Sequence, residues 1–483
     1  MEVFKMSTVS TSAARSRIEA LLDPNSFVEI GGLVSARATD FNLKQIDTPS
    51  DGVITGYGVI NDNLVYVYSQ DASVLGGTVG EMHARKIANL YDMAMKMGAP
   101  VIGLIDSAGL RLQEAMDALN GFGEIYLKES MASGVIPQIT AIFGNCGGGL
   151  AILPAIADFT FMEEKNAHLF VNSPNALDGN SKDKCDTSDA KFQSEESGIA
   201  DFVGDESSIF AQIRDLISFL PANNEEEADE VVTNDSLNRA CGNIANGYKD
   251  AALAFSDIAD DNAFLEVKAN YGKEMVVGFI KLNGLTVGCV GNRSAIYDAE
   301  GKEAEKFDEV LSVNGSVKAA EFINFCDAFS IPILSLTNVK GYVACKCSEK
   351  RIARAVSKLT YAFANASVPK VNVILKEAYG SAYVSMNSKA IGCDVTFAWE
   401  DASIGTMDAK IAAKIMYDGE GADVIGKKAD EYAKLQDSAL AAAKRGYVDY
   451  IINPADARKY IIGAFEMLYT KREDRPAKKH GII

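Results

Sequence analysis

The segment that decides the fold is FGNCGGGLAILPAIADFTF, which runs from Phe143 to Phe161. Three consecutive glycines separate a buried-strand pattern, ITAIF, from an apolar helical pattern, LAILPAIA. The start of a helix leaves backbone N–H groups unpaired, and the absence of side chains lets another group approach them closely. Such a junction can hold a phosphate, stabilise a developing oxyanion or simply allow tight packing. Because the glycines lack the Lys-Ser/Thr of a P-loop, the last two interpretations are favoured.

The same junction occurs a second time in the chain. The segment GVIPQITAIFGNCGG is similar to ASVPKVNVILKEAYGS, and APVIGLIDSAGLRLQE is similar to IPILSLTNVKGYVACK. DFTF and DVTF follow downstream, and GVINDNLVYVYSQD from Gly58 is similar to GFIKLNGLTVGCVGN from Gly278. A long repeat that is used twice predicts two copies of one domain. Four anchor pairs are each 232 residues apart: Pro100 and Pro332, Gly109 and Gly341, Pro137 and Pro369, Gly148 and Gly380.

Strands and helices alternate in each copy. The runs VIGLI, ITAIF, ILSL and VNVIL are continuously apolar, which is typical of strands buried on both faces. Helical patterns such as GEMHARKIANLYDMAMKMG precede them, so the class is α/β with a largely parallel sheet. An acidic stretch at Pro221–Asn238 is the expected boundary, which gives domains at 1–235 and 236–483. The polar residues 173–198 are expected to form a long loop.

Composition excludes several classes of function. The net charge is −19, from 47 Lys+Arg against 66 Asp+Glu, which argues against nucleic acid and anionic membranes as partners. No apolar run approaches the roughly 18 residues of a membrane span, and no signal peptide is recognisable, so we expect a cytoplasmic protein without membrane insertion. With 3 histidines in the chain, a histidine base is not expected. The 8 cysteines are scattered, and the C-x-C of Cys345 and Cys347 is a weak metal signal, so we predict no metal site.

Five segments in the right order carry a family resemblance across roughly residues 15 to 400. PQITAIFGNCGGGLAILPAIADFTFM and DSAGLRLQE resemble the ClpP/crotonase fold, in which two backbone N–H groups stabilise acyl-CoA enolates. Nearly the whole chain resembles the carboxyltransferase subunit of biotin-dependent acyl-CoA carboxylases, the propionyl-CoA carboxylase β-subunit group. The same module forms the α-subunit of sodium-translocating methylmalonyl-CoA or glutaconyl-CoA decarboxylases. The matching segments are RSRIEALLDPNSFVEIG, GVITGYGVINDNLVYVYSQDASVLGGTVGEMHARKI, APVIGLIDSAGLRLQEAMDALNGFGEI, AFLEVKANYGKEMVVGFIKLNGLTVG and SVPKVNVILKEAYGSAYVSMNSKAIGCDVTFAW.

The resemblance implies two tandem crotonase-like domains that transfer a carboxyl group between carboxybiotin and the α-carbon of a short acyl-CoA. Both partners become enolate-like, so two oxyanion holes are needed, the first copy serving acyl-CoA and the second biotin. Biotin itself takes the α-proton, and no side-chain base is required. The residues implied for the first hole are Gly148 and Gly149, with Gly109 or Leu110; those for the second are Ser381 and Ala382, next to Gly380; those near the substrate are Ala108, Arg111 and Val384.

The resemblance also implies partners. The biotin belongs to a separate carboxyl carrier protein, because MAMKMG at Met93–Gly98 lies in a helical pattern rather than on an exposed hairpin. A biotin carboxylase subunit would make the system a carboxylase, whereas a membrane decarboxylase β-subunit would make it a sodium pump. A homodimer or hexamer is expected. Arg111, Arg85 and Lys86 are candidates to hold the phosphates of CoA by their sequence position.

The chain departs from the family in several places, and rival hypotheses follow from them. The loop VKGYVACKCSEKR stands where a Pro-Gly-Phe segment is usual, Ser381 stands where Gly is frequent, Val384 where Asp is, and Gln193 where His is. One alternative is a non-catalytic paralogue. Another is a biotin-independent crotonase-type hydratase or hydrolase, which would need a carboxylate base such as Glu114 or Asp117.

Overall fold

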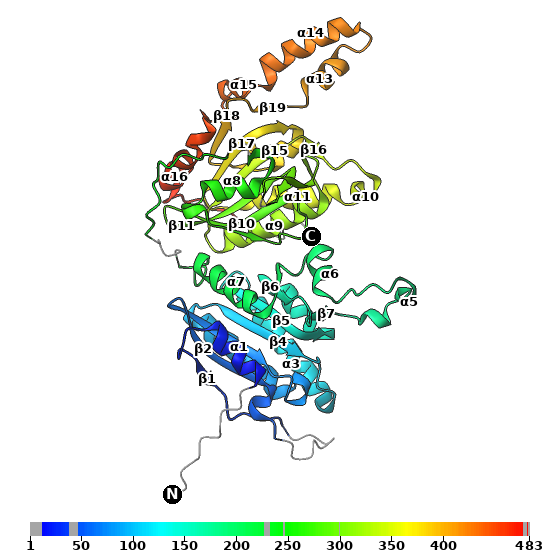
Figure 1. The fold of residues 1–483 in the computed structure, drawn as a ribbon, viewed down its shortest axis with the longest axis vertical. Helices are drawn as coiled ribbons and strands as arrows, with labels where there is room; N and C mark the ends of the chain where they lie inside the picture. The colour runs from blue at the N-terminus through cyan, green and yellow to red at the C-terminus, as the bar shows by residue number, and fades with distance from the viewer. Residues whose placement is uncertain are drawn as a thin grey trace. The chain divides into compact units, whose positions relative to one another are not determined.

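The computed structural model describes residues 12–37, 47–226, 232–244, 247–298, 300–476 and 481. The chain forms two compact units, Met1–Glu226 and Glu227–Ile483 (Figure 1). This division lies before the boundary at residue 235 that the sequence predicts.

The first unit is built on a mixed sheet of strand order β1-β2-β3-β4-β5-β6-β8, with β7 paired to β5. The strands from β3 onward are parallel, and β1 and β2 form an antiparallel edge. Its strands are β1 (Val28–Ile30), β2 (Val53–Ile60), β3 (Asn63–Gln70), β4 (Val101–Ser107), β5 (Gln138–Gly147), β6 (Phe159–Glu163), β7 (His168–Phe170) and β8 (Phe202–Gly204). Its α-helices are α1 (Ala13–Leu21), α2 (Glu81–Met97), α3 (Ala115–Ala132), α4 (Leu153–Ile156), α5 (Asn180–Asp183), α6 (Ala190–Glu195) and α7 (Glu206–Phe219).

The second unit repeats this topology in the order β9-β10-β11-β15-β17-β18-β20, with β19 paired to β17. Its main strands are β9 (Phe264–Val267), β10 (Met275–Leu282), β11 (Leu285–Asn292), β15 (Ile333–Val339), β17 (Lys370–Tyr379), β18 (Val395–Trp399), β19 (Ser403–Gly405) and β20 (Tyr450–Ile452). Short pairs are β12 (Ala295–Tyr297) with β13 (Glu303–Lys306), and β14 (Val310–Leu311) with β16 (Gly341–Tyr342). Its α-helices are α8 (Ala251–Ile258), α9 (Val313–Ala328), α10 (Lys346–Glu349), α11 (Ile352–Asn365), α12 (Gly380–Ser385), α13 (Ala409–Met416), α14 (Ala422–Tyr432), α15 (Ala439–Lys444) and α16 (Ala457–Leu468).

The duplicated hairpin corrects one detail of the sequence comparison. Val53 pairs with Gln70 in the first copy, and Met275 pairs with Asn292 in the second, so Gly56 corresponds to Gly278. The sequence comparison had placed Gly58 there. A side chain at Gly56 or Gly278 would collide with the carbonyl oxygen of the neighbouring edge strand and with a phenylalanine ring. Close approach of backbones therefore requires glycine at this position in both copies.

Helices cover both faces of each sheet, as buried parallel strands require (Figure 1). In the first unit α2 and α3 pack together on one face, and α1 and α7 pack together beside the sheet on the other. In the second unit α9 and α11 pack together in the same way. Each unit has its own apolar core of buried side chains. The helical hairpin α13–α14, which has no counterpart among the described residues of the first unit, extends away from the sheet of the second unit (Figure 1).

In each copy, an arginine of the last helix binds a backbone carbonyl at the end of the first helix and a nearby aspartate; we call this group of contacts the arginine staple. In the first, Arg214 of α7 donates to the carbonyl of Leu21 at 2.9 Å and pairs with Asp23 at 2.6 Å. In the second, Arg458 of α16 donates to the carbonyl of Ile258 at 2.7 Å and pairs with Asp260 at 2.5 Å. Each aspartate also accepts a backbone N–H from the hairpin turn of its own copy. The staple thus ties the first helix, the last helix and the hairpin turn together.

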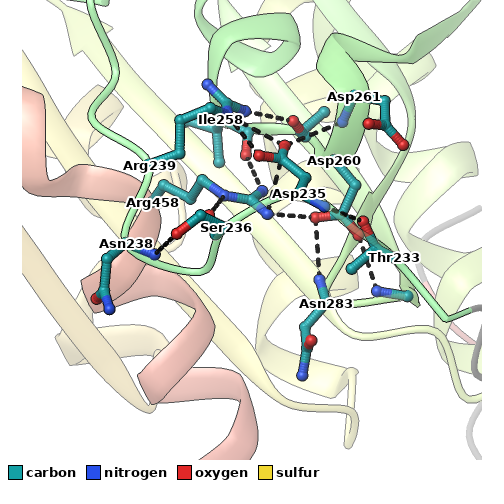
Figure 2. Close-up of polar contacts among 12 residues, drawn as sticks. Thr233, Asp235, Ser236, Asn238, Arg239, Ile258, Asp260, Asp261, Asn283 and Arg458 are labelled. Carbon is teal, nitrogen blue, oxygen red and sulfur yellow. Dashed lines mark hydrogen bonds and ion pairs between the residues drawn. The ribbon is translucent and has the colours of Figure 1, made fainter.

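The staple of the second copy is larger and includes the chain entering the unit (Figure 2). Arg458 is fully buried and also donates to the carbonyl of Ser236 at 3.2 Å. Asp235 pairs with Arg239 at 2.9 Å and accepts the N–H of Asp261 at 3.1 Å. The residues just before position 236 are therefore anchored to the second unit.

A buried lysine is also repeated at the 232-residue offset. Lys86 of α2 donates to the carbonyls of Ser50 and Val53, and Lys318 of α9 donates to those of Lys268 and Tyr271 at 2.7 and 2.9 Å. Burial lowers the pKa of Lys86 to about 8 and that of Lys318 to about 7. Through these hydrogen bonds, each lysine holds in place the loop next to the edge strand of its sheet.

The polar stretch 173–198 contains more structure than expected from the sequence. The short helices α5 and α6 lie within it, and Asp189 caps α6 by accepting the N–H of Phe192 at 2.7 Å. Gln193 is buried and donates to the carbonyls of Leu169 and Thr187. Among the described residues, no helix combines the length and apolarity needed to cross a membrane.

Candidate active site

The first glycine junction lies at the carboxyl end of β5. Gly148 has φ of +64°, and the chain continues through a 3₁₀ turn, Gly148–Ile152, into the single-turn helix α4. The helix expected over residues 150–157 is therefore shorter and begins as a 3₁₀ turn. A methyl group on Gly148 would meet no atom within 4 Å, so the space beside it is open. The hydroxyl of Tyr126 from α3 donates to the carbonyl of Gly149 at 2.5 Å and fixes the orientation of that peptide.

The loop after β4 lies next to this junction. It carries Gly109 and Leu110, the two alternative donors predicted from the sequence. Ser107 pairs with Cys146 across the sheet, and the Cβ of any residue at Gly109 would lie 3.3 Å from the carbonyl oxygen of Gly147. The N–H of Gly109 donates to Ser107 Oγ at 3.1 Å, and the N–H of Ala108 donates to the carbonyl of Gly76 at 3.0 Å. Val79 forms a parallel bridge with this segment: its N–H donates to the carbonyl of Gly109, and its carbonyl accepts the N–H of Arg111. The N–H of Leu110 takes no part in this bridge. Of the two predicted donors, the N–H of Gly109 is thus engaged within the loop and that of Leu110 lies outside these hydrogen bonds.

The second glycine junction lies at the carboxyl end of β17. Gly380 has φ of +62°, within a few degrees of Gly148 at the matching repeat position. It opens the short helix α12, whose first N–H groups, those of Gly380, Ser381 and Ala382, have no acceptor inside the helix. A cavity of about 490 Å³ lies against it. Its lining includes Lys340, Tyr342, Glu377, Ser381, Thr406 and Asp408.

Two features shape this cavity. The hydroxyl of Tyr342 from β16 donates to Ser381 Oγ at 2.8 Å. Lys340 forms ion pairs with Glu309 and with Glu377, the latter at 2.9 Å, and these carboxylates raise the pKa of Lys340. The charge of Lys340 is thus compensated by these carboxylates, and the hydroxyl pair of Tyr342 and Ser381 lies beside the first N–H groups of α12.

The family model of the carboxyl transferase domain matches residues 10–483. The chain belongs to the carboxyl transferase family. It is 38% identical to methylmalonyl-CoA decarboxylase subunit alpha of Propionigenium modestum, over 97% of this chain and 92% of that one. It is 38% identical to the propionyl-CoA carboxylase beta chain of Roseobacter denitrificans, over 97% and 93%.

A solved structure agrees over the same length. A crystal structure of transcarboxylase 12S, a hexamer with hydrolysed methylmalonyl-coenzyme A bound, superposes with a TM-score of 0.90 and 37% identity, over 97% of this chain and 92% of that one. The family resemblance and the duplicated crotonase-like α/β fold predicted from the sequence are confirmed. The prediction of an enzyme of the carboxyltransferase class is confirmed as well.

In this carboxyl transferase chain, Arg111 has a different role from the predicted one. Its side chain is fully buried and pairs with Asp51 at 2.5 Å and with Glu114 at 2.8 Å. It also donates to the carbonyl of Thr78 at 2.7 Å. The guanidinium therefore cannot reach a CoA phosphate at the surface. Instead it locks the loop that carries Leu110 to the start of α2.

The other predicted phosphate contacts are also occupied. Lys86 is buried on backbone carbonyls, as described above, and Arg85 is an exposed residue that pairs with Glu81 at 2.9 Å. The predicted base Glu114 is buried in the Arg111 pair and accepts the N–H of Glu81 at 2.6 Å. Asp117 is exposed and pairs with Arg37. Both carboxylates that the hydratase alternative named are therefore engaged in ion pairs.

Both histidines within the described residues are also engaged in hydrogen bonds. His83 is fully buried, with its ring between Gln70 and the carbonyl of Asp51, and burial lowers its pKa to about 3. His168 is bonded to Ser188 Oγ at 3.1 Å, and His480 lies outside the described residues. In the same part of the chain, no three His, Cys, Asp or Glu side chains gather as a metal site would require.

Val384 lies half-buried on α12, one turn after Gly380. Its carbonyl accepts the hydroxyl of Ser388 at 3.0 Å. Sequence reasoning missed both tyrosines of the junctions. Tyr342 could have been found, because it stands at the repeat position of Leu110. Tyr126 has no such signal, since its contact with Gly149 depends on how α3 packs against the turn.

Proposed function

We propose that this chain is the carboxyltransferase component of a biotin-dependent acyl-CoA system. It moves a carboxyl group between biotin on a separate carrier protein and the α-carbon of a short acyl-CoA. The observation that carries the proposal is the pair of matched glycine junctions, Gly148 with φ of +64° and Gly380 with φ of +62°. A reaction in which two carbonyl oxygens gain negative charge needs two sets of preorganised donors.

In the first copy, Leu110 and Gly149 would donate backbone N–H groups to the thioester oxygen of acyl-CoA. Arg111 would hold the loop that carries Leu110 through its contact with Thr78, and Tyr126 would hold the peptide that follows the Gly149 N–H through its bond to the Gly149 carbonyl. In the second copy, Ser381 and Ala382 would donate to the ureido oxygen of biotin. The cavity of about 490 Å³ and its hydrogen-bond donors fit a small polar ring of that kind.

The chemistry needs no further reagent. Bound biotin would supply the carboxyl group and a ureido nitrogen for the α-proton, so that an N–C and a Cα–H bond would break as a C–C and an N–H bond form. The protein's part is to hold both oxygens and to lower the cost of the charge that develops on them. This division suits a site whose histidines and whose candidate carboxylates are engaged elsewhere.

The acyl group is proposed to be short, and methylmalonyl-CoA is the first substrate to test. Methylmalonyl-coenzyme A in hydrolysed form is bound in the transcarboxylase 12S structure, and methylmalonyl-CoA appears in the name of the relative from Propionigenium modestum. The partner would be a biotin carboxyl carrier protein, with either a biotin carboxylase or a membrane decarboxylase subunit. Relatives of both kinds are equally identical to this chain, and the half-reaction is the same in both. A homodimer or hexamer is proposed, since transcarboxylase 12S is a hexamer.

The test incubates the purified protein with free biotin and methylmalonyl-CoA and follows loss of the carboxyl group. We expect turnover that requires biotin. Hydration or thioester hydrolysis without biotin would favour the crotonase-type alternative, and inactivity toward every acyl-CoA would favour the non-catalytic one.

A matched pair of variants tests the first junction. Gly148→Val fills the open space at the site and should abolish turnover. Gly301→Val is the control, because Gly301 also has positive φ, +76°, and a Cβ added there would meet no atom within 4 Å, but it lies in the β12–β13 turn. Both variants carry the same backbone strain. Equal activity of the two would remove Gly148 from the site.

A further inference from the structure

The two copies differ in side-chain chemistry at two matched positions of their junctions. In the first copy these positions hold Leu110 and Gly149, which have no hydroxyl group. At the 232-residue offset the second copy holds Tyr342 and Ser381. The two hydroxyl groups of the second copy are hydrogen-bonded to each other at 2.8 Å. The duplication thus keeps the backbone of the junction and adds a side-chain pair to one copy.

The direction of this bond leaves a free proton on Ser381. A phenol is a stronger acid than an alcohol, so Tyr342 donates and Ser381 Oγ accepts. A serine hydroxyl that accepts one bond still has its own proton to donate. Ser381 is exposed and lines the cavity of about 490 Å³, so the proton can be directed into that space. The bond from Tyr342 also polarises the serine hydroxyl and makes it a better donor.

The other polar side chains of the cavity wall are already engaged. Lys340 and Glu377 form an ion pair with each other, and Asp408 caps α13 by accepting the N–H groups of Lys410 and Ile411. Thr406 lies 3.4 Å from the hydroxyl of Tyr432, and Tyr379 is bonded to Ser403. Within the described lining, Ser381 is therefore the side chain best placed to donate to a ligand.

We propose that the Ser381 hydroxyl is a catalytic donor at the second junction, and that Tyr342 is the residue that positions it. The ligand is a carbonyl oxygen that becomes negatively charged, as in a cyclic urea, and this assignment rests on the proposed function. Ser381 adds a side-chain donor to the backbone N–H groups of residues 381 and 382. The first copy, with Leu110 and Gly149, holds its oxygen by backbone alone.

The experiment is a double-mutant cycle in the full-length protein, assayed with free biotin and methylmalonyl-CoA. Removing one preorganised donor is expected to lower kcat by about 100-fold in Ser381→Ala. Tyr342→Phe should lower kcat by about tenfold, because the serine remains but is no longer oriented. In the double variant, Tyr342→Phe should add no further loss. The KM for methylmalonyl-CoA, which binds at the first junction, should stay unchanged throughout.

Two further variants keep the result interpretable. Ser381→Thr retains a hydroxyl and should recover most of the activity lost in Ser381→Ala. Tyr417→Phe removes a phenolic hydroxyl group at the C-terminal end of α13 and should leave kcat unchanged. Full activity of Ser381→Ala, or additive losses in the double variant, would overturn the inference while the proposed function stands. If the unmodified protein shows no biotin-dependent turnover, the proposed function fails and this inference fails with it.

Discussion

Tyr126 acts on the first junction through a single hydrogen bond to the carbonyl of Gly149. That bond fixes a peptide plane next to the proposed donor. A methyl group on Gly149 would lie 2.9 Å from the Tyr126 hydroxyl, so glycine and tyrosine are fitted to each other. Side chains outside the glycine motif, such as Tyr126, therefore help to set the direction of the backbone N–H groups within it.

Tyr126→Phe should therefore lower kcat for biotin-dependent decarboxylation by about three- to tenfold, the worth of one hydrogen bond. Stability to urea should change by no more than about 1 kcal/mol, because the ring stays in place. Tyr417→Phe is the control for the loss of a tyrosine hydroxyl group elsewhere in the protein. An unchanged kcat would show that the turn holds its shape without this bond.

Lys318 gives a prediction about pH. Burial lowers its pKa to about 7 from 10.5, so between these values the unfolded chain binds more protons than the folded one. The stability contributed by this group therefore rises with pH from about 7 upward, by at most about 1.4 kcal/mol per pH unit. Urea unfolding of the unmodified protein and of Lys318→Met at pH 7, 8 and 9 measures this difference.

We expect the stability of the unmodified protein relative to Lys318→Met to increase over that range. Lys350→Met is the control, because Lys350 is exposed and its removal should leave the pH dependence as it was. A difference that stays flat with pH would mean that Lys318 remains charged in the folded protein.

At the scale of elements, the sequence predicted the pattern of the fold but not the ties between its parts. The glycine spacing and the apolar runs were enough for the strands β4, β5, β15 and β17 and for the duplication. The burial of Arg111 could not be predicted, because its partner Asp51 lies sixty residues earlier in the chain. The 3₁₀ start of the turn after β5 likewise depends on packing rather than on local propensity.

The two arginine staples differ in burial, and this leads to a prediction. Arg458 is fully buried, whereas the side chains of Arg214 and Asp23 are 28% and 23% exposed. Arg458→Met leaves Asp260 as an uncompensated buried carboxylate and should cost about 3–5 kcal/mol. Arg214→Met should cost about 1 kcal/mol, because water can solvate Asp23. Urea unfolding of both variants checks the order, and equal losses would contradict it.

At the scale of the whole molecule, each unit owns a complete sheet, a core and a staple. Composition and repeats predicted this organisation, since four anchor pairs share one offset. The sequence predicted that the second unit begins at residue 236, but it did not predict the contacts of the preceding residues, because an acidic stretch looks the same whether it is a linker or an anchored segment. The contacts of Asp235 with Arg239 and Asp261 decide this point.

The cysteines give a test of the core in both units at once. Cys185, Cys345 and Cys347 are exposed, and Cys146, Cys241, Cys289, Cys326 and Cys393 are buried. Burial also raises the pKa of the buried thiols, that of Cys393 to about 12, so they are poor nucleophiles. A chromogenic disulfide should titrate three thiols rapidly in the native protein and all 8 in denaturant. More than three rapid thiols would indicate that a core opens readily.

The matched junctions have a consequence for inheritance. Each unit has its own hydrophobic core and its own arginine staple. A substitution at one junction therefore does not require a compensating substitution at the other. The hydroxyl pair of Tyr342 and Ser381 can have arisen in one half while Leu110 and Gly149 persisted in its twin. The chain therefore carries an internal standard, in which Leu110, Gly148 and Gly149 of one junction can be judged against the residues 232 positions away.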